Sequence, residues 1–232
     1  MQSQRPRPGR QRPHTLEELV RTLPRQYIKV LSNPSIVTFT EEMRGATWRL
    51  VGVQILGWMT LLSICGLLIV LIRALILILT TSLDLAGIGS TIGLTLLQAL
   101  LVPMLLLIDT MLVFLLARVF GGRGTLVVQS YTCLLFQIPL STIVSILTFI
   151  PGVGIVLAIL FGFVVFIYGM LLQIFAVTAV HRLDVRTAVA TVFIPAVITL
   201  ILTWVLIANI SPILAHVGAA SLFNIVLIHI LT

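Results

Sequence analysis

The chain has 232 residues, of which 59% are hydrophobic and 9% are charged, and its formal net charge is +7. An average soluble domain contains about 25% charged residues. A water-soluble globular fold is therefore excluded, because too little polar surface is available to cover the apolar residues. Disorder is excluded as well, because disordered chains combine low hydrophobicity with high charge. We expect a protein that is dissolved in a lipid bilayer.

Residues 1–14 form a basic segment that is rich in proline and contains Arg5, Arg7, Arg10 and Arg12. No long apolar stretch follows them directly, so they are not typical of a signal peptide. The composition predicts a disordered tail that helps to set the orientation of the protein in the membrane. The same arginines are candidate contacts for anionic lipid at the cytoplasmic face. No folded basic domain accompanies them, so binding to nucleic acid is not indicated.

Residues 15–47 carry two helix-start signals before the first long apolar stretch. A capping box opens at Thr15, and apolar residues then recur on one helical face until Pro24, which we expect to end or bend the helix. Asn33 and Pro34 form the second signal, with Asn33 as the cap and Pro34 at the first helical position. The second helix is expected to run directly into the first span. Both are predicted to be cytoplasmic amphipathic helices that lie at the membrane interface. A helical cap packed on the inner end of the bundle is the alternative.

Long stretches without charged residues predict the membrane-spanning helices. A hydrocarbon core of about 30 Å needs about 20 helical residues, and the apolar runs are too long and too unbroken for the strands of a membrane barrel. The predicted spans are 48–72, 91–118, 125–149, 153–179 and 187–209. The expected fold class is an all-α integral membrane protein with a five-helix domain at 48–209.

The distribution of lysine and arginine predicts the orientation. Nine of the 14 basic residues lie within residues 1–49. Arg118 and Arg123 flank the second loop, and Arg182 and Arg186 flank the fourth, whereas Arg73 is the single basic residue on the opposite side. Because basic residues are enriched in cytoplasmic loops, the N-terminus is predicted to be cytoplasmic and the C-terminus external.

Several short motifs carry a resemblance to a known family. They are Asn-Pro-Ser-Ile-Val-Thr-Phe-Thr-Glu-Glu at 33–42, Gly-Gly-Arg-Gly-Thr at 121–125, Pro139, Ile-Pro-Gly-Val-Gly at 150–154, and His181-Arg182-Leu183 with Thr187-Ala188. With these motifs, the chain over about 30–205 resembles the Yip domain family of Ypt/Rab-interacting membrane proteins, in its prokaryotic-type form. The resemblance implies five spans in the orientation that the charges predict. It also implies a prokaryotic plasma membrane as the localisation and a membrane-protein or GTPase partner, and it supplies no catalytic residues.

The titratable residues do not indicate an enzyme. The His-Glu-x-x-His zinc motif is absent from the sequence, and an intramembrane aspartyl protease needs two deep aspartates, whereas Asp109 is the single one here. The four histidines are far apart in the sequence, and His181 is assigned to a loop. We therefore expect no catalytic residues, no metal site and no cofactor.

Four polar residues inside the predicted spans are the candidate site. Counted from the cytoplasmic ends at 1.5 Å per residue, they lie about 8 to 18 Å deep, in the same half of the membrane. They are Gln54, Asp109, Gln137 and Gln173. As a structural cluster they would join the helices by hydrogen bonds, with a neutral Asp109 bonded to Gln137 or Gln173. As a functional cluster they would form a polar path for protons or small solutes.

Residues 210–232 are apolar but are not flanked by charged residues. They are expected to form a helix at the outer interface, with a sixth span as the alternative. By the family resemblance, the function expected for the chain is a non-enzymatic scaffold or adaptor in membrane organisation or in the transport of membrane components. The alternative is a small-solute or ion transporter or channel that uses the cluster around Asp109. A homo-oligomer would supply the internal symmetry that five spans lack.

Overall fold

A computed structural model describes residues 16–80, 85–148 and 154–214 of the chain. In this part the structure is 91% helical and contains no strand, as the sequence predicts. A short 3₁₀ helix at Met43–Gly45 lies between α2 and α3. The α-helices are α1 (Leu16–Ser32), α2 (Ile36–Glu42), α3 (Trp48–Thr80), α4 (Leu85–Val119), α5 (Leu126–Thr148), α6 (Gly154–His181) and α7 (Val185–Leu214).

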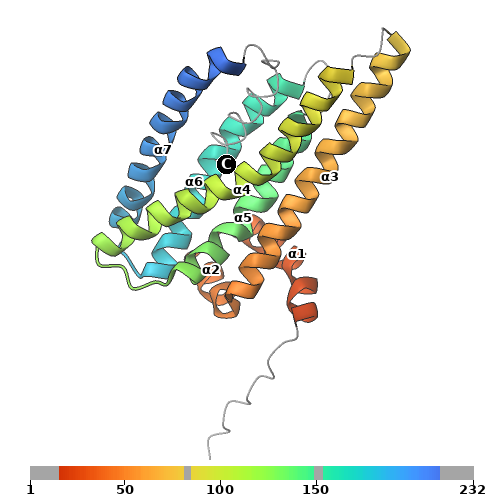
Figure 1. Cartoon of the computed structure of the whole chain (residues 1–232). Coiled ribbons are helices and arrows are strands. Elements are labelled where there is room, and N and C mark those ends of the chain that lie inside the picture. Colours follow the sequence, from red (N-terminus) through yellow and green to blue (C-terminus); the bar gives the residue numbers. More distant parts are fainter. Residues whose placement is uncertain (1–15, 81–84, 149–153, 215–232) are drawn as a thin grey trace, which may run out of the picture.

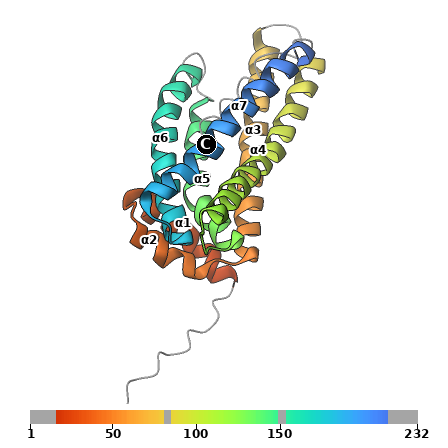
Figure 2. The same cartoon turned by 90° about the vertical axis from the view of Figure 1, so that its left-hand side faces the viewer.

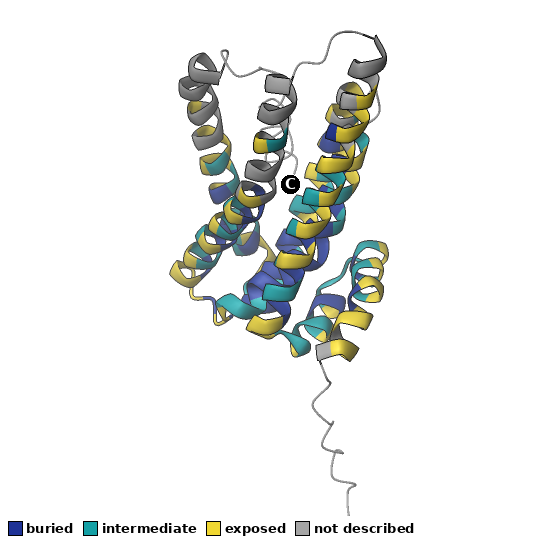
Figure 3. Ribbon diagram, turned by 45° about the vertical axis from the view of Figure 1, so that its right-hand side comes forward, coloured by how far each residue is buried: buried dark blue, intermediate teal, exposed yellow. Residues whose placement is uncertain are grey.

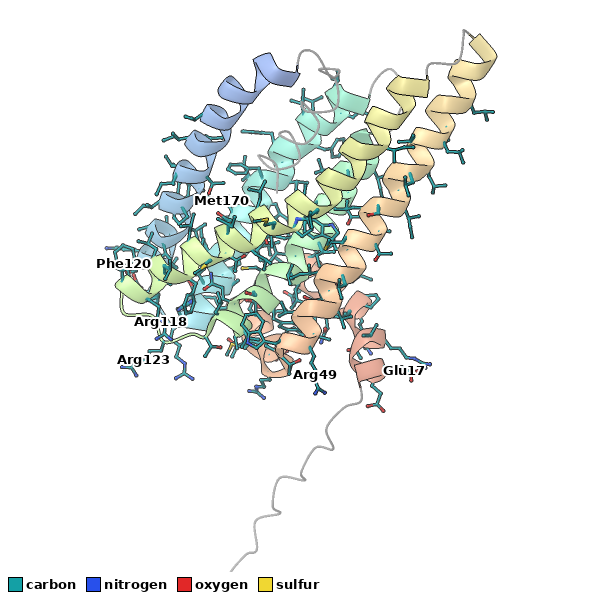
Figure 4. The ribbon with its side chains drawn as sticks, in the orientation of Figure 1. Glu17, Arg49, Arg118, Phe120, Arg123 and Met170 are labelled. Atoms are coloured by element: carbon teal, nitrogen blue, oxygen red, sulfur yellow. The ribbon has the colours of Figure 1, made fainter. Side chains whose placement is uncertain are left out.

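The five long helices form a bundle in which α5 is central (Figures 1 and 2). α5 contacts α3, α4 and α6, whereas α7 contacts α4 and α6. The short helices α1 and α2 pack at the lower end of the bundle in Figure 1, where α1 contacts α5 and α2 contacts α6. Three arginines at or near this lower end, Arg49, Arg118 and Arg123, are labelled in Figure 4. We call this end of the bundle the arginine end.

Four helices of the described chain are long and apolar enough to cross a membrane. These helices are α3, α4, α5 and α6, and their apolar segments lie at the positions of the first four predicted spans. In α7 the apolar segment that can be assessed, Val185–Ile201, is shorter than a full span. The finding supports an all-helical membrane protein with four candidate spans, and the fifth span stays a prediction.

The helices continue beyond the predicted spans on the side opposite the arginine end. α3 continues to Thr80 and α4 begins at Leu85, so most of the stretch 74–90, which separates the first two predicted spans, is helical. The apolar run Ala74–Leu79 predicts this continuation of α3, whereas the start of α4 at Leu85 is earlier than predicted. α7 continues to Leu214, so residues 210–214 belong to α7, and the remainder of the segment 210–232 lies outside the described residues.

The N-terminal helices differ from the prediction in three local features. α1 runs through Pro24 and ends at Ser32, because its apolar face continues beyond the proline and packs on the bundle. The N-cap of α2 is Ser35, whose hydroxyl accepts a hydrogen bond from the Thr38 amide at 3.1 Å. α2 does not continue into α3, since Ala46 follows the 3₁₀ helix in an extended conformation.

The buried residues gather where α5 meets its neighbours and the two N-terminal helices (Figure 3). One apolar cluster joins residues of α1, α2, α3, α4, α5 and α6, among them Val30, Phe39, Trp58 and Phe136, which are almost completely buried. α1 and α2 therefore form part of the core. The helical cap, which was the alternative in the sequence analysis, describes their packing.

Candidate functional site

Asp109 lies on α4 and joins three helices. Its carboxylate accepts a hydrogen bond from the hydroxyl of Thr199 on α7, with 3.4 Å between Oγ1 and Oδ1. The side chain of Gln173 on α6 is its second hydrogen-bond partner. The structure therefore pairs Asp109 with Gln173, one of the two partners considered for it, and adds Thr199, which sequence reasoning missed.

The chemistry of this site is that of a carboxyl group held by two neutral polar groups. Gln173 is buried, whereas Asp109 and Thr199 are partly buried. An interhelical polar contact in a membrane contributes about 0.6 kcal/mol on average. Within the described residues, no group of three or more His, Cys, Asp or Glu side chains could hold a metal ion.

The two remaining residues of the predicted cluster have a different environment. Gln54 on α3 is 3% exposed, and both polar atoms of its amide lack a hydrogen-bond partner among the described residues. Gln137 on α5 is equally buried, and its Oε1 atom has no partner in this part of the chain. One helical turn after Gln54, the Trp58 indole N–H is also buried and unpaired among the described residues. Hydrogen bonds therefore do not connect Gln54 to Asp109.

A second polar group, which sequence reasoning missed, lies at the arginine end. His181 was assigned to a loop, but it is the last residue of α6 and is 1% exposed. The Gln129 amide nitrogen on α5 donates to the Thr110 carbonyl on α4 at 3.3 Å, so its Oε1 atom faces the histidine. The distance from Oε1 to Nε2 of His181 is 2.5 Å, and Nε2 is therefore the donor. Gln129 thus links α4, α5 and α6.

Two glycines of the α4–α5 turn make room for His181. A Cβ atom on Gly122 would lie 2.6 Å from Nδ1 of His181, and one on Gly124 would lie 2.5 Å from a methyl group of Val180. The amide of Arg123 donates to the His181 carbonyl at 3.2 Å, which closes the turn around the end of α6. The sequence carries a signal for this contact, since Gly-Gly-Arg-Gly predicts the tight turn that is observed. What the turn encloses is not visible in the sequence.

Basic side chains surround this closed end on the outside. Arg118 lies over the ring of Phe114, with 5.3 Å between the guanidinium carbon and the ring centroid. Figure 4 shows Arg118 and Arg123 close to the end of α4. Arg182 and Arg186 are exposed at the α6–α7 turn. The four arginines of the N-terminal tail, Arg5, Arg7, Arg10 and Arg12, lie outside the described residues.

Charged residues of α1 and α2 form an ion-paired group beside the bundle. Nζ of Lys29 lies 2.9 Å from a carboxylate oxygen of Glu41 and 2.7 Å from one of Glu42. The hydrogen bonds that Lys29 donates to Glu42 and Glu41 raise the pKa of Lys29 above its ordinary value, and the bond to Lys29 lowers the pKa of Glu41. The ion pairs join the two helices of the hairpin to each other.

Comparisons with known proteins return no relative. No protein-family model matches the chain, no curated protein is detectably similar to it, and no solved structure matches it. The resemblance to the Yip family stays a prediction.

Proposed function

We propose that this protein is a non-enzymatic, multi-pass membrane protein that acts as a scaffold or adaptor in membrane organisation or in the transport of membrane components. In this proposal α7 is the fifth span, the arginine end faces the cytoplasm, and the membrane is a prokaryotic plasma membrane. The positive-inside rule supports this orientation, because Arg118, Arg123, Arg182 and Arg186 flank turns at the same end.

The observation that carries the proposal is the bonding of Asp109. Its partners, Gln173 and Thr199, lie on two other helices, so the carboxyl group links α4 to both α6 and α7. Residues in such a position stabilise the packing of helices. The closure of the arginine end by the Gly-Gly-Arg-Gly turn and by α1 and α2 is a further argument, since a scaffold needs a stable surface at this end.

The experiment that tests the proposal is the Asp109→Asn variant. An amide can still accept from Thr199 and bond to Gln173, so we expect a folded protein whose melting temperature changes by less than the equivalent of about 0.6 kcal/mol. In liposomes, wild type and variant should both show the proton and solute leak of empty vesicles.

A transporter or channel is the second candidate, because Asp109 is partly exposed and stands beside two polar side chains on other helices. An intramembrane carboxyl group that water reaches is a typical ion-handling group. If wild-type protein conducts protons or a solute and folded Asp109→Asn does not, the scaffold proposal is wrong and the transporter is supported.

The partners proposed for the scaffold follow from its charge and from the family resemblance. They are anionic lipid at the cytoplasmic face, a GTPase or another membrane protein, and a second copy of the chain. No nucleic acid is proposed. Co-purification at native expression level, with wild type and with a chain that lacks residues 1–14, would show whether the basic tail contributes to any of these contacts.

A further inference from the structure

The hairpin made by α1 and α2 reaches far along the side of the bundle. The Tyr168 hydroxyl on α6 donates to the carbonyl of Leu31, near the end of α1. Tyr168 precedes His181 by 13 residues, which places it about 20 Å from the arginine end of α6. Even if the tyrosine side chain points along the helix axis toward the arginine end, the carbonyl of Leu31 lies far from that end, beside the middle of α6.

A second contact gives the same depth independently. Phe39 of α2 packs against Phe136 of α5, with 6.2 Å between the ring centroids and an interplanar angle of 86°. Phe136 follows Leu126, the first residue of α5, by 10 residues, or about 15 Å along the helix. Both contacts are made with candidate spans of α5 and α6. The tip of the hairpin therefore lies beside segments that cross the membrane.

Two large apolar side chains of the hairpin are exposed near its tip, where Ser32 and Asn33 are exposed as well. Ile28 and Val37 are each 67% exposed, although they lie on short helices whose opposite faces are buried. Residues 30–40 contain no charged side chain. Exposed apolar side chains beside a membrane span fit the acyl chains of lipid.

Several backbone groups at the tip are hydrogen-bonded within the protein, which lowers the cost of placing a non-spanning segment in lipid. The Asn33 amide donates to the Lys29 carbonyl at 3.0 Å, and the Asn33 carbonyl accepts from the Thr38 hydroxyl at 2.9 Å. Pro34 has no N–H group to satisfy. The carbonyl of Leu31, which lies in the last turn of α1, accepts a hydrogen bond from Tyr168.

The charged residue of the hairpin that lies nearest to the tip is Lys29, and its ammonium group is paired with two carboxylates. Lys29 bonds to Glu41 and Glu42, and Arg21 bonds to Glu17 at 2.8 Å. A lysine can extend its ammonium group toward the headgroups while its methylene groups stay in apolar surroundings. The ion pairs therefore suit the headgroup level, with the uncharged tip deeper.

From these observations we infer that the α1–α2 hairpin inserts, tip first, into the lipid leaflet at the arginine end. Ile28 and Val37 contact acyl chains, and the ion pairs of Lys29 with Glu41 and Glu42 lie among the headgroups. This inference replaces a pair of helices lying flat on the membrane surface with a re-entrant hairpin. It does not depend on the proposed function or on which side of the membrane the arginine end faces.

Spin labels at single cysteines of the full-length protein in lipid nanodiscs test the inference. The background is Cys65→Ala with Cys133→Ala, and the labels are placed at Ile28→Cys and Val37→Cys. Glu17→Cys is the water control, because the side chain of Glu17 is 75% exposed near the start of α1. Leu56→Cys is the lipid control, because Leu56 is 64% exposed within the α3 span.

The measured quantity is the collision rate of each label with oxygen, which concentrates in lipid, relative to a water-soluble nickel complex. We expect the ratio at Ile28→Cys and Val37→Cys to be several-fold higher than at Glu17→Cys and close to that at Leu56→Cys. If either hairpin label gives the ratio of Glu17→Cys, the tip is in water, and the inference is wrong. That result would point to a protein partner as the cover for Ile28 and Val37.

Discussion

α5 and α3 are neighbouring candidate spans with opposite surroundings. The span in α5 is 72% buried and has the lowest mean hydropathy of the four, whereas the span in α3 is 12% buried and has the highest. In a water-soluble protein the buried helix would be the more apolar one. The reversal is what a bilayer requires, because lipid is as apolar as a leucine side chain and does not drive leucine inward.

Polar side chains decide which helix is central. A polar group in lipid is costly unless it is hydrogen-bonded and shielded by neighbouring helices, so helices that carry such groups are favoured in the interior. The buried polar residues of α5 are Gln129, Ser130, Thr132, Gln137, Ser141 and Ser145. On α3, Leu56, Ile64, Leu68 and Leu71 are exposed instead. Three predictions test this difference.

Matched leucine truncations should give the largest difference. Leu134 of α5 is completely buried, and Leu56 of α3 is 64% exposed. Leu134→Ala leaves a cavity among packed side chains and is expected to cost about 2 kcal/mol or more. In Leu56→Ala the side chain faces lipid before and after the substitution, so the free energy of unfolding should change by less than about 0.5 kcal/mol. Equilibrium unfolding in mixed detergent micelles measures both, and equal losses would contradict the assignment of α3 to a lipid-facing position.

Matched glycine substitutions should have the next largest effect. Gly122→Ala places a Cβ atom 2.7 Å from the Ala117 carbonyl as well as against His181, so the turn before α5 must shift, at a cost of about 1 to 3 kcal/mol. Gly57 of α3 has no atom within 4 Å of an added Cβ. Gly57→Ala should therefore be neutral or stabilise the helix by up to about 1 kcal/mol. A Gly122→Ala protein as stable as wild type would show that the turn does not hold His181.

The pH dependence of the hairpin should be the smallest effect, since the ion pair between Lys29 and Glu41 is exposed. The pKa of Glu41 is lowered from its ordinary 4.5, so the stabilisation by Lys29 is complete above pH 4.5 and is lost as the pH falls through the lowered value. The pKa of Lys29 is raised from 10.5, so the same pairs are lost again only as the pH rises through that raised value.

The Lys29→Gln variant isolates this effect from the other carboxyl groups. The difference in melting temperature between wild type and Lys29→Gln should be constant between about pH 5 and pH 10 and should shrink toward zero under more acidic conditions. A difference that grows as the pH falls below 4.5 would mean that the pairs with Glu41 and Glu42 do not stabilise the hairpin.

Turns and helix ends were predicted correctly where residues next to one another in the sequence determine them. The Gly-Gly-Arg-Gly turn is visible in the sequence because glycines between two apolar stretches end one helix and permit the next, and Gly121 has a φ of 84°. Pro24 does not end α1, one of the two effects predicted for it, because packing of the apolar face on α5 outweighs the local preference of proline. Asn33 and Pro34 misled the prediction by two residues, since Ser35 offers an equally good cap.

The candidate site was predicted only in part, for a reason of geometry. The depth of a polar residue along its helix follows from counting, and Asp109 and Gln173 do lie at levels that let them meet. The direction in which each side chain points around its helix depends on how the helices pack. Gln54 and Gln137 are therefore buried without the expected connection to Asp109, and Thr199 was not identified.

The sequence by itself predicted a membrane protein, its helical class and the positions of four candidate spans. These features depend on runs of residues along the chain. Only the tertiary structure decided that α5 is central, that His181 is enclosed by Gly122 and Gly124, and that α1 and α2 pack deep against the bundle. These features depend on contacts between residues far apart in the sequence. Their energies are set by fit and by hydrogen bonding between helices, which no pattern within one segment records.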